Sequence, residues 1–517
     1  MGYIRIAIYF TLATFATTAA SAEKVESGLA NAVQNLDRPS IERLLEESID
    51  VNAPQVDGTT ALQWATYHDD SQLVQRLLHA GAAVTPENRY GVTALSIACT
   101  NGNVDIINQL LDAGADPNTS LPGGETVLMT ASRTGRVGAV RALIANGSNL
   151  RASEHSRGQT ALMWAVAEGH VDVVETLIEV GADFRTPLDS GFSPLLFAVR
   201  EGHIDVVRTL LNAGVDVNET VEEVVRPDRS YRAGRPIRIG TTPLLLAVTN
   251  AHCDLAAVLL DSGADPNLAV TGYTALHMIP KVRKPGGGDN DPAPYGSGQM
   301  TSLDLVRRLA VHGADLNARM TERRNLNNTR HHERGSTPFM LAALVADAEL
   351  MRLLSELGAD PALKNAEFST PLMAAAGLGT RSPGEDAGTE EEVVEAVRVA
   401  LDLGANINAV DDNGETVMHG AAYKNLPKVV AFLAANGANI DTWNHENKYG
   451  WTPLTIARGY RFGNFKPSPV TVAALEQIML AANVVPPTEE KAEGVDIYAA
   501  PTQSPAQGQG RIPPRQQ

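Results

Sequence analysis

GQTALMWAVAEGHVDVVETLIEVGADF, residues 158–184, contains two short helical patterns joined by a turn. Thr160 precedes the first pattern, where a threonine hydroxyl caps the free N–H groups of a helix start. Gly169-His170 predicts a tight turn between the two helices. Gly181 predicts a left-handed residue that ends the second helix. The stretch therefore predicts a pair of helices folded back on each other.

The second helix of this stretch has one apolar face. The apolar side chains that recur at three- and four-residue spacing are Val171, Val174, Leu177 and Ile178. Each helix has only about two to three turns, which is shorter than the ~12 to 15 residues that an isolated helix needs. One unit cannot fold alone, so it must stack on copies of itself.

Copies of the unit follow one another along the chain. The commonest interval between them is 33 residues. Where proline follows the threonine, it occupies the first helical position, where a missing N–H costs nothing; these prolines are Pro194, Pro243, Pro338, Pro371 and Pro453. The repeats start at Gly58, Gly91, Gly124, Gly158, Gly191, Gly240, Gly272, Gly335, Gly414 and Gly450, with a variant start at Phe368.

The repeated unit resembles the ankyrin-repeat family. The resemblance rests on units such as GVTALSIACTNGNVDIINQLLDAGADPN at 91–118 and GFSPLLFAVREGHIDVVRTLLNAGVDVN at 191–218, and it covers about residues 25–480. It implies an all-α repeat solenoid of stacked helix-turn-helix units with β-hairpin fingers. It also implies that the first helices and the fingers line a concave face.

The pattern divides the chain into four parts. Residues 1–22 have Arg5, an apolar run and then Ala20-Ser21-Ala22, which predicts a signal peptide cleaved before Glu23. A membrane anchor is the alternative, but the apolar run falls short of the ~20 residues that span a bilayer. Residues 23–57 are predicted to form a degenerate N-terminal capping repeat. Residues 58–484 are the array of about eleven units, and residues 485–517 are a disordered tail rich in proline and glutamine.

Four insertions interrupt the 33-residue spacing. Those at 219–239 and 318–334 lengthen fingers, and those at 280–300 and 378–391 lengthen the turn between the two helices of a unit. Loops on a rigid scaffold are places where function concentrates. We therefore expect the insertions to stand outside the core and to take part in recognition.

The chain is strongly acidic, with a formal net charge of −18. Cleavage of the leader removes Arg5 and no acidic residue, so the net charge of the mature chain goes from −18 to −19. Such a chain repels nucleic acid and anionic lipid. The leader favours a periplasmic or secreted protein with no membrane span in its mature form. Cys99 and Cys253 lie four units apart, so we expect two free, buried thiols.

The two lengthened fingers are rich in arginine. A guanidinium group binds carboxylate or phosphate through two parallel hydrogen bonds, which predicts an acidic partner. The alternative is that these fingers are neutralised internally, by Glu219, Glu222, Glu223 and Asp228 or by acidic helix surfaces nearby. Adjacent His331 and His332 lack a third ligand at suitable spacing, so no metal site is predicted. The arginines chosen as candidate partner-binding residues are Arg226, Arg229, Arg232, Arg235, Arg319, Arg323 and Arg324.

A second set of candidates follows from the resemblance, which places the residues closing each first helix on the concave face. Their chemistry is mixed, as on a protein-binding surface. These candidates are Tyr67, His68, Asn101, Arg133, Glu168, Arg200, Glu201, Tyr423 and Lys424.

Other aromatic and histidine side chains are predicted to stabilise the fold. Trp64 and Trp164 should be buried between repeats. Phe192, Tyr273 and Trp451 follow the turn glycine, where packing is favoured over partner contact. Histidines expected to pack or form internal hydrogen bonds are His170, His203, His252, His277 and His419.

The sequence lacks the motifs of common catalytic, nucleotide and haem sites, so neither enzymatic activity nor a cofactor is predicted. It predicts a non-catalytic scaffold that binds a protein partner, in an oligomeric state that it does not determine. A module binding acidic glycan or cell wall is the second hypothesis. An enzyme is the third, and a concave pocket with a perturbed titrating group, or a buried carboxylate pair, would favour it.

Overall fold

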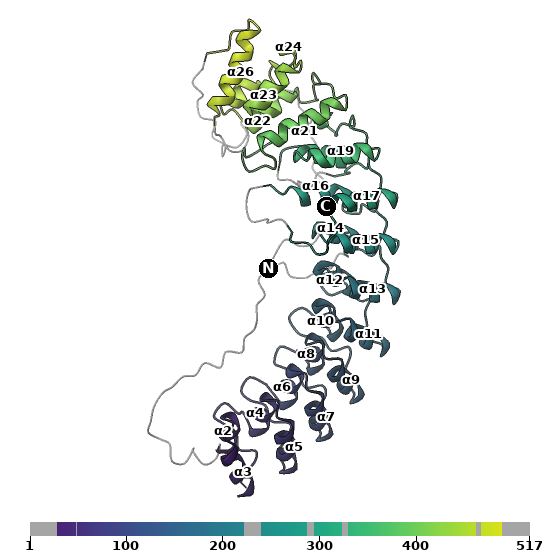
Figure 1. Cartoon of the computed structure of the whole chain (residues 1–517), viewed down its shortest axis with the longest axis vertical. Helices are drawn as coiled ribbons and strands as arrows, with labels where there is room; N and C mark the ends of the chain where they lie inside the picture. Colours follow the sequence, from purple (N-terminus) through teal and green to yellow (C-terminus); the bar gives the residue numbers. More distant parts are fainter. Residues whose placement is uncertain are drawn as a thin grey trace, which may run out of the picture. The chain divides into compact units, whose positions relative to one another are not determined.

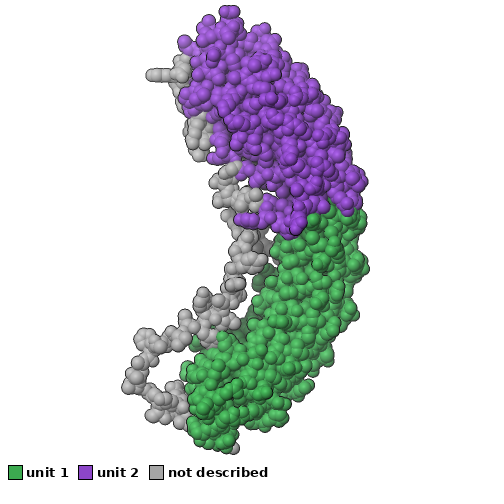
Figure 2. Space-filling model, in the orientation of Figure 1, with its two compact units in different colours: residues 1–247, 254–265 green, residues 248–253, 266–517 purple. Residues whose placement is uncertain are grey.

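The protein was analysed as a computed structural model, which describes residues 28–47, 49–221, 239–286, 294–322, 329–461 and 467–488. The chain forms two compact units (Figure 2). Unit 1 contains residues 1–247 and 254–265, and unit 2 contains residues 248–253 and 266–517. The leader, most of the tail and most of the finger at 219–239 lie outside the described residues.

The described part of unit 1 is a stack of helix pairs. The first helices contact one another in one row and the second helices in a parallel row (Figure 1). The capping repeat is itself a pair, α2 with α3. The pairs are α2 (Gly28–Gln34) and α3 (Arg38–Glu46), α4 (Ala61–Tyr67) and α5 (Ser71–His79), α6 (Ala94–Asn101) and α7 (Val104–Asp112), α8 (Val127–Arg133) and α9 (Val137–Ala145), α10 (Ala161–Glu168) and α11 (Val171–Glu179), and α12 (Pro194–Glu201) and α13 (Ile204–Asn212).

The same arrangement continues in unit 2. The division between the units falls within the pair α14 (Pro243–Thr249) and α15 (Cys253–Asp261). The following elements are α16 (Ala275–Arg283) and α17 (Ser302–Val311), α18 (Pro338–Leu344) and α19 (Ala348–Glu356), α20 (Pro371–Ala375) and α21 (Glu390–Asp402), α22 (Val417–Lys424) and α23 (Pro427–Ala435), the short α24 (Ile440–Trp443), and α25 (Pro453–Ala457) and α26 (Pro469–Ala481).

Polar residues at the helix ends fix the start and stop of each pair. Thr160 caps α10 by accepting a hydrogen bond from Met163 N, as predicted, and Thr60, Thr93 and Thr126 cap their helices in the same way. All five predicted prolines occupy the first position of a first helix. Glycines in the left-handed conformation close the helices, as Gly169 does after α10.

The core lies between the helices of each pair and between neighbouring pairs. In α11 it contains Val174 and Leu177 as predicted, but it also contains Val173, whereas Val171 and Ile178 are only half-buried. The prediction that Val171 and Ile178 belong to the buried face is therefore wrong. The buried face is shifted because each second helix packs both on its own first helix and on neighbouring second helices. Cys99 and Cys253 are both buried and form no disulfide, which confirms that prediction. Burial raises the pKa of the Cys99 thiol to about 12.

Asparagine side chains join consecutive repeats outside the apolar core. Asn52 donates to Gly81 O at 3.1 Å and accepts from Ala83 N at 2.7 Å, so one amide satisfies a carbonyl and an N–H of the next repeat. Asn118, Asn218, Asn267 and Asn408 make the equivalent pair of bonds. The stack is therefore held by both packing and a periodic set of hydrogen bonds.

Regular β-hairpin fingers are absent from the described residues, which contain no named strand and only two isolated bridges, Ser120 with Thr126 and Ser153 with Thr160. The fingers are instead tight turns. In one of them Asn88 N donates to Val92 O and Gly91 N donates to Asn88 O, while Arg89 N donates to Asp57 O of the preceding finger. The β-hairpin part of the fold prediction is therefore not confirmed.

Two of the predicted insertions have different boundaries in the structure. Residues 280–283 continue α16, with Pro280 buried inside the helix, so the loop at 280–300 begins only after Arg283. Residues 390–391 begin α21, which has 13 residues where most second helices have 9. The extension is favourable because Thr389 caps it and three glutamates occupy its first turn, at the positive end of the helix dipole. Within the described residues, no helix is both long and apolar enough to cross a membrane.

Candidate functional site

The C-terminal ends of the first helices in unit 1 form the first surface to consider. Seven of the predicted residues lie there, on α4, α6, α8, α10 and α12 or at the residue that caps α4. We call these seven the first-helix row. Tyr67, Glu168, Arg200 and Glu201 are exposed, and His68, Asn101 and Arg133 are half-buried.

Aromatic rings gather at the α4 end of the row. Tyr67 is 53% exposed, and its ring meets that of Trp64 edge-on at 5.5 Å between centroids. The His68 ring lies 6.0 Å from Trp64, and His68 Nε2 lies 3.1 Å from Gln34 O. Trp64 itself is buried, as predicted, and its indole N–H donates to Gln55. Tyr67 is thus a rigidly supported ring that faces solvent.

Arginines lie over aromatic rings farther along the row. The Arg133 guanidinium is 5.4 Å from the centre of the Trp164 ring, and Arg200 is 4.6 Å from that of Phe197. Trp164 is half-buried rather than buried, because it lies under this arginine at the surface. Arg133 is also 3.5 Å from Glu125, and Arg200 pairs with Glu201. These contacts orient the arginines and leave part of each exposed.

The prediction is wrong for the exposure of Tyr423 and Lys424, which are buried at 6% and 5% exposure. Lys424 Nζ donates to Ala387 O in the loop between α20 and α21, and Arg461 donates to Tyr423 O. Burial lowers the pKa of Lys424 to about 8 and that of Arg461 to about 10. The inserted loop and the segment after α25 therefore cover a position that is open in unit 1.

The arginine fingers are only partly within the described residues. Arg319 donates to Lys364 O of the next finger at 3.0 Å. His331 is buried with its Nε2 3.2 Å from Ser336 Oγ, and His332 is half-buried. Among the acids expected to neutralise the first finger, Glu219 accepts a hydrogen bond from Ser193. The candidates that fall outside the described residues are Arg226, Arg229, Arg232, Arg235, Arg323 and Arg324.

Several side chains predicted to stabilise the fold do so. Phe192 and Tyr273 are buried, while Trp451 is half-buried. His170 Nε2 lies 2.9 Å from Arg133 O and His203 Nε2 lies 3.0 Å from Ala167 O, so each joins its repeat to the preceding one. His252 lies 2.8 Å from Ser297 Oγ. His277 and His419 accept from capping residues, and burial lowers their pKa values to about 4 and about 3.

Unit 2 contains a polar pocket of about 120 Å³ that sequence reasoning did not identify. The residues that line it come from four fingers, the loop after α20 and helix α22. They are Arg330, His331, His332, Glu367, Ser369, Leu378, Gly379, Thr380, Asn413, Glu415, Tyr423 and Tyr449. Arg330 N donates to Gly379 O, which joins the finger to the inserted loop along one wall.

Glu415 is the buried carboxylate of this pocket. Its Oε1 accepts from the Tyr423 hydroxyl at 2.8 Å and from Asn447 Nδ2 at 3.0 Å. Burial raises the pKa of Glu415 to about 7; the bond from Tyr423 opposes this rise, the Asp411 charge adds to it and Lys448 opposes it. Burial also raises the pKa of Tyr423 above its usual range. The carboxyl group therefore titrates near neutral pH.

Asp411 and Glu415 together are the buried carboxylate pair that would favour an enzyme. Asp411 is occupied, because its Oδ1 accepts from Asn413 N and Glu415 N and its Oδ2 accepts from the Ser369 hydroxyl. These bonds shape the finger and give Asp411 a structural role. Glu415 remains the one carboxylate of the pair with an oxygen available to the pocket, an arrangement better suited to binding than to paired acid–base catalysis. Within the described residues, no cluster of three acids, histidines or cysteines could hold a metal ion.

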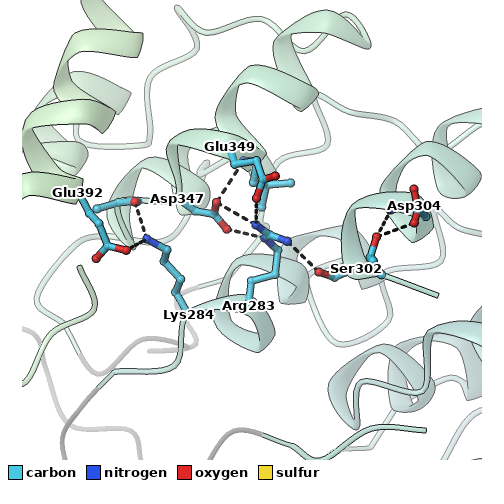
Figure 3. Close-up of polar contacts among 10 residues, drawn as sticks. Arg283, Lys284, Ser302, Asp304, Asp347, Glu349 and Glu392 are labelled. Atoms are coloured by element: carbon cyan, nitrogen blue, oxygen red, sulfur yellow. Dashed lines mark hydrogen bonds and ion pairs between the residues drawn. The ribbon is translucent and has the colours of Figure 1, made fainter. Parts of the chain in front are cut away.

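Ion pairs join the ends of the two helix-turn insertions in unit 2 (Figure 3). Arg283, at the end of α16, contacts Asp347 at 2.6 Å and Glu349 at 2.9 Å at the start of α19, and it donates to Ser302. The next residue, Lys284, contacts Glu392 in the added turn of α21 at 2.7 Å. The insertions are therefore bound to the scaffold by charge pairs and are part of its structure.

The stacked helix pairs define a helical repeat protein, and the family comparison specifies which kind. Ankyrin repeats in the three-copy form match residues 29–121, 129–221 and 387–464, and a single ankyrin repeat matches 239–269. These segments cover more than half of the chain, which therefore belongs to the ankyrin-repeat family. Ankyrin repeats generally mediate protein–protein interaction and are typically non-catalytic.

Two curated proteins illustrate the distance to known relatives. Human neurogenic locus notch homolog protein 1 is 28% identical over 189 residues, which cover 36% of this chain and 6% of that protein. The E3 ubiquitin-protein ligase KEG of Arabidopsis thaliana is 25% identical over 176 residues, which cover 31% of this chain and 9% of the ligase. The chain thus spans less than a tenth of either relative's length.

Proposed function

We propose that this chain is an exported, non-catalytic scaffold that binds a protein partner through the first-helix row of unit 1 and through its arginine-rich fingers. The proposal rests mainly on the half-exposed ring of Tyr67, which is supported by the rings of Trp64 and His68. Tyrosine, tryptophan and arginine dominate the binding energy of protein interfaces. Arg133 and Arg200, held over Trp164 and Phe197, extend the same chemistry along the row.

The charge of the chain supports a protein partner over nucleic acid, because a formal net charge of −18 opposes a polyanion. In this proposal the fingers at 219–239 and 318–334 recognise acidic groups on the partner. Residues 1–22 act as the leader, so the mature chain starts at Glu23 and works in the periplasm or outside the cell. N-terminal sequencing of the chain recovered from each cell fraction tests the location.

The binding surface is tested by capture of partners from exported fractions with matched variants. The row variant carries Tyr67→Ala, Arg133→Ala and Arg200→Ala. The control carries Arg76→Ala and Arg208→Ala, two exposed positions on the second helices. We expect a specific protein that the wild type and control retain and the row variant loses. A partner retained equally by all three would exclude the first-helix row.

The fingers are tested separately. Replacing Arg229, Arg232, Arg323 and Arg324 with serine should weaken capture and make it less sensitive to salt, without lowering the melting temperature. Lost folding would contradict the assignment of these arginines to recognition rather than to stability. Unchanged capture would show that the partner does not use them.

A further inference from the structure

The pocket in unit 2 contains two polar atoms that lack partners. Both donors to Glu415 meet Oε1, and among the described residues no donor reaches Oε2. His332 Nδ1 is buried without a hydrogen bond and belongs to a residue that lines the same pocket. Buried polar groups in folded proteins normally have partners. A neutral His332 with its proton on Nε2 presents Nδ1 as an acceptor. Together with the unpartnered Oε2 of Glu415, this acceptor points to a ligand that carries N–H groups.

Another repeat of this chain shows what occupies the equivalent position. Glu125 follows Gly124 as Glu415 follows Gly414, and Arg133 stands at the helix position of Tyr423. There the Arg133 guanidinium approaches the Glu125 carboxylate at 3.5 Å. In the unit 2 repeat a tyrosine stands in place of the arginine, so this helix position supplies no cation to Glu415.

Positive groups of the chain lie around the pocket, and Arg330 is among the residues that line it, but within the described residues none of them donates a hydrogen bond to Glu415. Lys448 Nζ contacts Asn413 Oδ1 and lies 3.9 Å from Glu367 Oε1. Lys424 points to Ala387 O. The rings of Tyr423 and Tyr449 line the pocket beside the carboxylate. Aromatic faces attract cations, and each ring already lies near one, Arg461 at 6.0 Å from the centre of the Tyr423 ring and Lys448 at 5.1 Å from that of Tyr449. The volume of about 120 Å³ has room for roughly four water molecules, which suits the end of an alkylammonium chain.

We propose that this pocket binds an alkylammonium group, which donates to the Glu415 carboxylate and to His332 between the rings of Tyr423 and Tyr449. The group comes either from a lysine side chain of a protein or from a free primary amine. The site is separate from the first-helix row, so its failure would leave the proposed function of that row untouched.

The probe is n-butylammonium, observed by saturation-transfer NMR on the full chain at pH 8, where Glu415 is ionised. Neutral n-butanol and anionic butyrate are the ligand controls. We expect n-butylammonium to bind with a Kd of about 1 mM, which is weaker than the ceiling that its five heavy atoms allow. The two controls should bind at least about tenfold more weakly, because they lack the charge-assisted hydrogen bond.

Matched variants locate the site. Glu415→Gln should reduce the affinity at least about tenfold, whereas Glu125→Gln, at the same position of another repeat, should leave it unchanged. Tyr449→Ala alters a residue that is 42% exposed, and it should also weaken binding without threatening the fold. Equal binding of butanol, or full affinity in both pocket variants, would overturn the proposal.

A peptide separates the two sources of the ammonium group. Acetyl-Gly-Gly-Lys-Gly-Gly-amide should displace n-butylammonium if the pocket accepts a protein side chain, and the same peptide with norleucine should not. Binding of the free amine alone would assign the site to a small-molecule amine. Binding of neither cation would overturn the proposal.

Discussion

Two repeats with the same turn glycine and a related finger place equivalent tyrosines in opposite environments. Tyr67 and Tyr423 each stand nine residues after their turn glycine, Gly58 or Gly414. Each is followed by a finger with related sequence, Asn88-Arg89-Tyr90-Gly91 or Asn447-Lys448-Tyr449-Gly450. Yet Tyr67 is 53% exposed and Tyr423 is 6% exposed. The difference shows that the position within a repeat does not by itself decide what a side chain meets.

The cause lies in segments far from the repeat in sequence. The loop between α20 and α21 and Arg461 contact Tyr423 and Lys424, whereas the 33-residue units around Tyr67 carry no such loop. The same cover buries Glu415, while the corresponding Glu125 is less enclosed and pairs with Arg133. The insertions thus bury residues that would otherwise lie on the surface of a repeat. Substituting the equivalent residue in a covered repeat and in an open repeat measures how much this burial contributes to stability.

The largest expected difference in the free energy of unfolding is between variants that break a buried ion pair and an exposed one. Arg283→Ala should lower the free energy of unfolding by about 4 kcal/mol, because it leaves the Asp347 charge, 2% exposed, without its partner. Arg76→Ala breaks a pair with Glu42 in which both side chains are about half-exposed, and should cost under about 1 kcal/mol. Urea unfolding followed by circular dichroism measures both. Similar losses would contradict the structural role of the insertion.

Glu415 should make unit 2 less stable as the pH rises. Its pKa is about 7 in the folded chain against a reference value of 4.5, so the folded state holds the proton more tightly. This contribution is complete below about pH 4.5 and is lost as the pH rises through 7, by about 3 kcal/mol. Glu415→Gln should remove that loss, and Glu125→Gln should retain it. Unfolding curves of the three proteins at pH 5 and pH 8 test the prediction.

Alanine substitutions at two glycines allow a comparison of the inserted loop with an ordinary repeat. Gly379 has a φ of +86°, and an added Cβ would meet the backbone nitrogen of His331. Gly81 has a φ of +89° with no atom within 4 Å of that position. Alanine at Gly81 should cost about 1 kcal/mol, and at Gly379 about 2 kcal/mol more, because backbone contact adds to the strain. Thermal melts of the two variants measure the difference, and equal values would mean that the loop is not held against the finger.

The smallest expected loss of stability comes from removing a single tyrosine hydroxyl. Tyr423→Phe removes the donor to Glu415 and the acceptor of Asn447, so it should cost about 1.5 kcal/mol at pH 8. Tyr67→Phe changes a group at the surface and should cost less than about 0.5 kcal/mol. Chemical unfolding at fixed pH distinguishes them. A larger loss for Tyr67→Phe would reverse the comparison.

Most of the repeat architecture followed from local sequence. Thr160, the prolines at first helical positions and the two buried cysteines were predictable because capping, backbone geometry and apolar periodicity act within a few residues. Pro280 was assigned to the insertion at 280–300 from the repeat spacing, yet residues 280–283 continue α16 and bring Arg283 to Asp347. The long-range ion pair outweighed the local preference.

The candidate sites were predicted less completely than the fold. The first-helix row in unit 1 was found by repeat position, but Tyr423 and Lys424 were placed at the surface by the same rule and are buried. Glu415 carried one usable signal, a glutamate directly after the turn glycine, as in Glu125. Arg461 carried none, because its contact with Tyr423 O spans 38 residues of sequence.

The sequence by itself determined the helix pairs, their caps, the order of the repeats and the acidic charge, because these depend on near neighbours or on composition. The tertiary structure alone decided which copies of a repeated position stay open and which become buried. It did so by folding the inserted loop and Arg461 onto α22, with the finger at Arg330 hydrogen-bonded to that loop. Desolvation then changed the chemistry of Glu415, since burial penalises a charge that the same residue type would carry freely in water.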